Sequence, residues 1–133
     1  MPKQIWVNLP VKDIHQSKEF YTKLGFTVQT HDQEQLILRD FTSVVMLFPV
    51  STFKQFTRHD ITDTNQTTEV LLSIDAESRE EVDSFAEKAA IAGGTIFGEP
   101  SEVGGWMYGC GFTDLDGHRW NVLFRDMSKM PGK

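Results

Sequence analysis

Residues 9–26 read LPVKDIHQSKEFYTKLGF, and this stretch decides the fold. Asp13 is a good N-cap for a helix, and Gln16 three residues later completes a pattern that resembles a capping box. Apolar side chains then recur at helical spacing. Gly25 stands where the residue after a helix often takes a left-handed conformation. The stretch therefore predicts one helix that begins after Asp13 and ends before Gly25.

Strand-like segments flank this helix on both sides. Residues 4–9 are rich in β-branched and aromatic types, and Pro10 is expected to end that strand. Polar turn residues separate the segments that follow the helix. The first part of the chain is therefore read as β-α-β-β-β, with its last strands at 26–30, 35–39 and 43–48.

The second part of the chain repeats this order. Ser78 and Glu81 form a capping box, and Gly93-Gly94 ends the helix that follows. A tight turn at residues 114–117 precedes the last strand. The expected strands lie at 69–74, 95–97, 105–112 and 118–124.

These patterns predict an α+β fold of two βαβββ modules that form a cleft or partial barrel. We expect one domain over residues 1–133, because the chain is short for two independent cores. Residues 50–67 are mostly polar and read as a linker, with a short helix capped by Ser51. The expected parts are a first module at 1–49, this linker, a second module at 68–126 and a tail at 127–133.

Composition excludes several classes of function. The net charge of −6 argues against binding to nucleic acid or to an anionic membrane, since both need a basic face. The single Cys110 permits no intrachain disulfide, and we expect a small buried residue there rather than a nucleophile. No targeting segment or membrane span is visible, so the expected compartment is the cytoplasm.

Three stretches together resemble a known family. LPVKDIHQSKEFYTKLGF at 9–26, EVLLSID at 69–75 and FTDLDGHRWNV at 112–122 resemble vicinal oxygen chelate domains. This superfamily includes glyoxalases, bleomycin-resistance proteins and extradiol dioxygenases. The resemblance is greatest to small glyoxalase-like proteins described as lactoylglutathione lyases, and it spans nearly the whole chain.

The resemblance implies one divalent metal, held by side chains from the first and last strand of each half. Those positions fall here on Asn8, Glu69 and Asn121, and the fourth lies within residues 44–48. Only Glu69 is a strong ligand, because an amide oxygen is weak and uncharged. We therefore expect no metal and no other cofactor, with a divalent metal as the alternative. Glu69 is also the one candidate for a catalytic base.

Alternation of side chains along strands selects the rest of the candidate pocket. Glu69 and Arg119 have a simpler interpretation as solvated or paired surface charges, and the two asparagines as hydrogen-bonded buried amides. The aromatic residues after Gly104-Gly105, a pair expected to form a mobile loop, suit a core or a dimer contact as well. Histidines 15, 31, 59 and 118 are expected at the surface. The ligand-pocket candidates are Trp6, Asn8, Glu69, Trp106, Tyr108, Arg119 and Asn121.

Three functions remain open at this point. The first is a protein that binds a small organic molecule in the cleft without the usual metal site. The second is a metal-dependent lyase, isomerase or dioxygenase with an atypical ligand set, completed by His118 or by a partner chain. The third is a non-catalytic interaction module with exposed aromatic side chains. A homodimer is expected from the resemblance.

Overall fold

The computed structural model describes residues 2–31 and 34–129. The chain divides into two compact units, residues 1–63 and 64–133, with the boundary inside the expected linker. Each unit contains a four-stranded mixed sheet and a helix between its first and second strands. None of the helices in the described part of the chain combines the length and the apolar character needed to cross a membrane.

The first unit has the order β-α-β-β-β, followed by a second helix. Its strands are arranged β1-β4-β3-β2, with β1 parallel to β4 and the other pairs antiparallel. The elements are β1 (Trp6–Val11), α1 (Ile14–Lys23), β2 (Val28–His31), β3 (Gln35–Leu38), β4 (Val44–Pro49) and α2 (Val50–Thr57).

The predicted ends of α1 are confirmed. The Asp13 carboxylate accepts hydrogen bonds from the backbone N–H groups of His15 and Gln16, at 2.9 and 3.2 Å. These bonds satisfy donors that the first turn of a helix leaves free. Gly25 follows the last turn with φ 99°, a conformation that costs glycine little. Local chemistry therefore sets both ends of this helix.

The second unit repeats this topology. Its strands are arranged β5-β8-β7-β6, with β5 parallel to β8, as β1 is to β4. The internal repeat expected from the sequence is confirmed at the level of strand order. The elements are β5 (Leu71–Asp75), α3 (Arg79–Ala92), β6 (Thr95–Val103), β7 (Met107–Thr113), β8 (Arg119–Arg125) and the short 3₁₀ helix η1 (Met127–Lys129).

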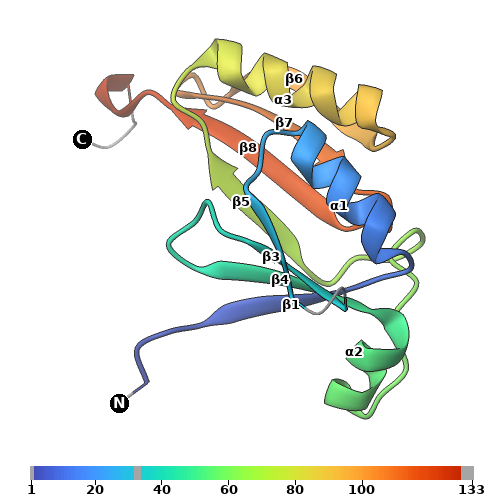
Figure 1. Ribbon diagram of the computed structural model, residues 1–133. Coiled ribbons are helices and arrows are strands. Elements are labelled where there is room, and N and C mark those ends of the chain that lie inside the picture. The colour runs from blue at the N-terminus through green and yellow to red at the C-terminus, as the bar shows by residue number, and fades with distance from the viewer. Residues whose placement is uncertain (1, 32–33, 130–133) are drawn as a thin grey trace. The chain divides into compact units, whose positions relative to one another are not determined.

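Helix α3 lies across one face of the second sheet (Figure 1). Ser78 Oγ accepts from the backbone N–H of Glu81 at 3.1 Å, so the predicted N-cap is confirmed, and Gly93 ends the helix with φ 106°. The stripe of Val82, Ala86 and Ala89 is buried. It covers alternate residues of β7 and β8, so this face of the sheet forms the core of the unit: Cys110, Phe112, Trp120 and Val122.

Several boundaries differ from the expectation. Pro10 lies inside β1, opposite Phe48, and β1 can tolerate it because it is an edge strand. The helix after β4 begins at Val50, with Pro49 and not Ser51 at its N-cap. Strand β6 runs on to Val103 and pairs with β7 throughout, with irregular register near Gly98.

Gly104 and Gly105 lie in the tight turn that joins β6 to β7, and the mobility expected for this segment stays a prediction. Val103 pairs directly with Met107 across this turn. Both glycines have positive φ, 64° and 80°, which suits a hairpin connection.

The turn at residues 114–117 is built around the Asp114 carboxylate. Its Oδ1 accepts hydrogen bonds from the backbone N–H groups of Asp116 and His118, both at 2.9 Å. The Thr64 side chain donates to the carbonyl of Asp116, and the Thr64 backbone approaches Gly117 closely. Thr64, at the start of the second unit, is therefore held against this turn by a hydrogen bond and a close backbone contact.

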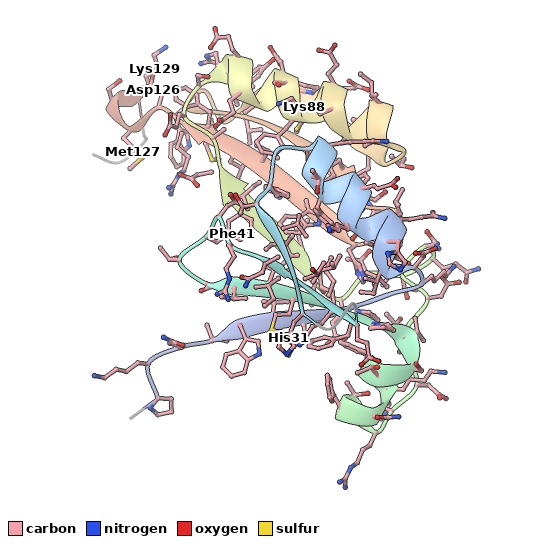
Figure 2. All side chains as sticks on the ribbon, viewed as in Figure 1. His31, Phe41, Lys88, Asp126, Met127 and Lys129 are labelled. Carbon is pink, nitrogen blue, oxygen red and sulfur yellow. The ribbon has the colours of Figure 1, made fainter. Side chains whose placement is uncertain are left out.

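The labelled side chains of Figure 2 lie in both units. His31 is at the end of β2 and Phe41 lies between β3 and β4. Lys88 is on α3, and Asp126 precedes η1, where its carboxylate accepts from Ser128 Oγ at 2.6 Å and lies 3.9 Å from Lys129 Nζ. The Ser128 hydrogen bond lowers the pKa of Asp126. Asp32, which was expected in the polar turn between the strands at 26–30 and 35–39, lies outside the described residues, and so do residues 130–133 of the expected tail.

Candidate functional site

One face of the first sheet carries a hollow of about 580 Å³. Trp6 and Val44 lie opposite each other in neighbouring strands, and Met46 follows two residues later on the same face. Ile37 of β3 pairs with Met46 and extends the floor. A hollow of this size matches the range of small-molecule sites. It is lined by Lys3, Gln4, Ile5, Trp6, Ile37, Arg39, Thr42, Ser43, Val44 and Met46.

The two faces of this sheet differ because their residues alternate. Leu9, Val11, Leu36 and Leu47 are buried on the opposite face, and α1 packs against β2, β3 and β4. On the hollow's face, α2 packs against β1 and β4, and the Phe56 and Phe48 rings meet edge to face at 5.0 Å. The helices leave the part of this face around Trp6 uncovered, and Trp6 is 54% exposed.

The charged residues of the hollow are cationic. Lys3 and Arg39 line it, and no Asp or Glu is among its lining residues. Arg39 Nε donates to Gln29 Oε1 at 2.9 Å, which orients the guanidinium. The neighbouring Asp40 carboxylate instead accepts from the backbone N–H of Thr27 at 2.7 Å. The hollow therefore combines an apolar floor with positive charge, although the chain as a whole carries −6.

Asn8 and Met46 face each other across β1 and β4 on this same side of the sheet. The sequence pattern predicted that Asn8 and Trp6 share a face, and the register confirms it. Of residues 44–48, Met46 is the one directly opposite Asn8. The first sheet thus offers an amide and a thioether where the resemblance implies two metal ligands.

Arg119 and Asn121 share the face of the second sheet that is turned away from α3. Arg119 lies opposite Leu71 of β5 and Asn121 opposite Ser73. Arg119 Nε donates to Thr68 Oγ1 at 3.1 Å, and its guanidinium carbon lies 4.5 Å from the centroid of the Phe97 ring. Two contacts therefore hold this cation in place.

Glu69 lies before β5, which begins at Leu71, so the expectation that it opens this strand was wrong. Its side chain is exposed. Among residues 2–31 and 34–129, no Asp or Glu forms a salt bridge with Arg119. Glu69 is therefore not the counter-ion of Arg119.

Tyr108 and Trp106 are not brought together with Arg119 and Asn121. The Tyr108 hydroxyl donates to Asp83 Oδ1 of α3 at 2.7 Å, which places its side chain on the helix face of the sheet. This bond raises the pKa of Tyr108. Trp106 borders the β6–β7 turn, and its backbone carbonyl accepts from the N–H of Asp126 at 2.7 Å. That turn is at the end of β7 opposite to Thr113, the partner of Arg119.

Cys110 is buried, as expected, with Sγ 3.7 Å from the Val82 carbonyl oxygen. Burial raises the pKa of its thiol from 9.0 to about 11, so it is a poor nucleophile. His118 is also buried, at 7% exposure, and the expectation of a surface histidine was wrong there. Histidines 15, 31 and 59 are exposed.

The residues at the implied metal positions do not fit a hard or borderline divalent cation. They supply the Asn8 and Asn121 amides, the Met46 thioether and the single carboxylate of Glu69. Such ions prefer several anionic oxygens or imidazole nitrogens. Within the described ranges, no three His, Cys, Asp or Glu side chains gather as a metal-binding group.

Sequence reasoning missed several residues of these two faces. Ile37, Arg39 and Met46 reach the hollow through strand pairing, which their local sequence does not reveal. Thr68 was placed at the start of the second module with no role in the site, and Phe97 was read as the end of a short strand. Alternation along β3 was the one available signal, since it places Ile37 and Arg39 opposite to the buried Leu36 and Leu38.

The chain was compared with protein-family models, with curated proteins and with solved structures. A family model described as Bleomycin resistance protein-like N-terminal matches residues 3–37. The structure of a hypothetical protein from S. aureus is 32% identical with TM-score 0.85, over 93% of this chain and 94% of that one. No curated protein matches at a significant level.

Two further structures show the fold alone, at 18% identity each. A glyoxalase-related enzyme from Fulvimarina pelagi has TM-score 0.83, over 94% of this chain and 89% of that one. A bleomycin resistance determinant encoded on the transposon Tn5 has TM-score 0.63, over 94% and 99%. Together with the paired βαβββ modules, these matches show that the chain has the fold of glyoxalase-related and bleomycin-resistance proteins, the vicinal oxygen chelate fold.

Proposed function

We propose that this protein binds a small organic molecule and does so without the divalent metal of its superfamily. The observation that carries the proposal is the hollow on the first sheet, about 580 Å³ in volume, which has Trp6 and Met46 in its lining. An exposed aromatic ring and a flexible thioether provide apolar contact area that adapts to a planar or branched ligand.

The polar groups of the hollow suit recognition of a ligand. Thr42 and Ser43 add hydroxyl groups, while Arg39 and Lys3 add positive charge. A few polar groups in an apolar lining fix a ligand's orientation, whereas the lining itself supplies most of the affinity. The arrangement favours an uncharged or anionic molecule over a cation.

The donor chemistry argues for binding rather than metal-assisted catalysis. A metal-bound mechanism needs a cation that polarises substrate oxygens. Asn8 and Met46 on the first sheet, and Asn121 on the second, are poor ligands for such a cation.

A fragment screen in the presence of EDTA tests this proposal. Binding is followed by NMR of ¹⁵N-labelled protein, with the Trp6 indole N–H as the reporter of the hollow. We expect fragments that shift this signal together with Ile37 and Met46, and Trp6→Ala to weaken them at least ~10-fold. Trp106→Phe is the control, because Trp106 borders the β6–β7 turn and not the hollow.

Two outcomes would count against the proposal. Fragments that bind only after a divalent metal is added would assign the protein to the metal-dependent members. Fragments whose shifts map away from the hollow and are unaffected by Trp6→Ala would move the site elsewhere. The homodimer and the cytoplasmic location remain predictions, and light scattering of the purified chain tests the first of them.

A further inference from the structure

The guanidinium of Arg119 is oriented by two contacts, one with a hydroxyl group and one with an aromatic ring. Its Nε donates to Thr68 Oγ1 at 3.1 Å, and its guanidinium stacks 4.5 Å from the Phe97 ring centroid. Phe97 is itself fixed, because its ring fills the space beside the bare backbone of Gly111 on the neighbouring strand. Arg119 is thereby oriented before any ligand arrives, and this lowers the entropy lost on binding.

Among the described residues, these two contacts leave one edge of the guanidinium unused. Thr68 takes the Nε hydrogen and Phe97 takes one flat face, so the terminal Nη groups keep their hydrogens for another partner. No Asp or Glu within the described ranges forms a salt bridge with Arg119. Parallel N–H groups on such an edge match the two oxygens of a carboxylate.

The surroundings of Arg119 are apolar on one side and polar on the other. Leu71, directly opposite on β5, is 50% exposed, and Phe97 is 42% exposed. Asn121 lies two residues along β8 on the same face, paired with Ser73. A ligand with an acidic group and an apolar body would meet a matching group at each position.

We propose that Arg119 binds the carboxylate of a small ligand, with Phe97 and Thr68 as its positioning residues. The inference goes beyond the proposed function and rests on it only for the nature of the occupant, a small organic molecule. It places a separate site on the second unit, taken by itself, and names its ligand class as an organic carboxylate. The observation that carries it is a preorganised guanidinium that has no ion-pair partner within residues 2–31 and 34–129.

Benzoate and benzamide form a matched pair of probes, because they have the same ring and differ in charge. Binding is measured by NMR on ¹⁵N-labelled protein, with the Arg119 Nε–H signal as the direct reporter. We expect benzoate to shift this signal and to bind at least ~10-fold more tightly than benzamide, in line with the strength of charge-assisted hydrogen bonds.

Arg125→Gln is the matched control for Arg119→Gln. Arg125 lies on the same strand and, by alternation, on the same face, opposite Met107 at the far end of the pairing. Both variants remove one positive charge. We expect Arg119→Gln to weaken benzoate at least ~10-fold, and Arg125→Gln to leave it nearly unchanged.

Two further variants test the positioning roles. Arg119→Lys keeps the charge and loses the planar fork, so it should recover only part of the benzoate affinity. Thr68→Val keeps the shape of the side chain and removes the acceptor, so it should weaken benzoate while the Arg119 Nε–H signal broadens. Loss of affinity without a change in that signal would overturn the positioning role of Thr68.

Equal effects of Arg119→Gln and Arg125→Gln, or equal binding of benzoate and benzamide, would overturn the inference. The proposed function would survive that result if fragments still bind at Trp6. Conversely, if fragments fail to bind at Trp6 while benzoate binds specifically at Arg119, that result would support the carboxylate site and contradict the proposed role of the hollow.

Discussion

The ring of Phe97 occupies the space that a side chain on Gly111 would need. A Cβ added to Gly111 would collide with two atoms of this ring and crowd a third, so the glycine leaves the room that the aromatic side chain occupies. Because Arg119 stacks on the same ring, the absence of a side chain at Gly111 determines where a cation on β8 lies.

Gly111→Ala is expected to displace the Phe97 ring. The added methyl group must push the ring aside, and overpacking of this kind costs about 1–3 kcal/mol in the free energy of unfolding. Urea unfolding measures this cost. Displacement of the ring should also mobilise Arg119 and weaken benzoate binding.

Phe97→Ala provides the control for this variant. In a chain that lacks the ring, the methyl group at Gly111 has room, so the cost of Gly111→Ala should fall well below its value in the parent. If Gly111→Ala lowers the free energy of unfolding equally with and without the Phe97 ring, the effect comes from the backbone and not from the ring. That result would contradict the proposed contact between Gly111 and Phe97.

Tyr108→Phe is expected to leave ligand binding unchanged. Its hydroxyl bonds Asp83 of α3, on the face of the sheet opposite to Arg119 and Asn121. Removing this bond should lower the urea midpoint slightly, because α3 loses one contact with β7. A loss of benzoate or fragment affinity in this variant would show that Tyr108 takes part in the pocket after all.

Asp114→Ala is expected to destabilise the protein by about 1–3 kcal/mol. The carboxylate oxygen accepts from two backbone N–H groups, those of Asp116 and His118, and alanine leaves both without this acceptor. Asp114→Asn keeps one oxygen in place and should cost much less. Urea unfolding of the two variants separates the acceptor's role from that of the charge, and equal losses would contradict this view of the turn.

Cys110 is expected to make the protein less stable at high pH. The pKa of its thiol is about 11 in the folded chain and 9.0 ordinarily, so the unfolded chain loses this proton first. The neutral thiol's contribution is complete below about pH 9 and is lost as the pH rises towards 11, on the order of 2 kcal/mol in total.

Unfolding of the parent and Cys110→Ala in urea, across pH 8 to about 11, isolates this contribution. The difference in free energy between the two should change in favour of the variant above about pH 9. Native protein should also react slowly with iodoacetamide at pH 8, since little thiolate is present. A difference that stays constant with pH would contradict the buried, neutral thiol.

Local signals predicted much of the fold. Asp13, Ser78 and the glycines after each helix act through neighbouring backbone groups, so their effect is written within a few residues of sequence. The caps marked where each helix begins and ends. The strand-like segments on either side then gave the order of elements along the chain, β-α-β-β-β in each half. Strand ends were harder: β6 continues past Phe97 because β7 pairs with it, and this pairing partner is distant in sequence.

The site was predicted less completely, for the same reason. Alternation correctly grouped Trp6 with Asn8, and Arg119 with Asn121. It did not show that Tyr108 faces α3, because either face of β7 could have received the helix. Arg119 and Phe97 lie on different strands, and their contact depends on the room that Gly111 leaves on a third strand. No single stretch of sequence contains all three residues.

The most direct test of the account is metal binding by the protein purified without a histidine tag. Its metal content is measured first, and Zn²⁺, Ni²⁺, Mn²⁺ and Fe²⁺ are then titrated by calorimetry into the metal-free chain. We expect far less than one metal per chain and no affinity tighter than about millimolar, because amides and a thioether are weak ligands for these ions. Near-stoichiometric metal that is lost in Glu69→Ala would contradict the account and group the chain with metal-dependent proteins of this fold.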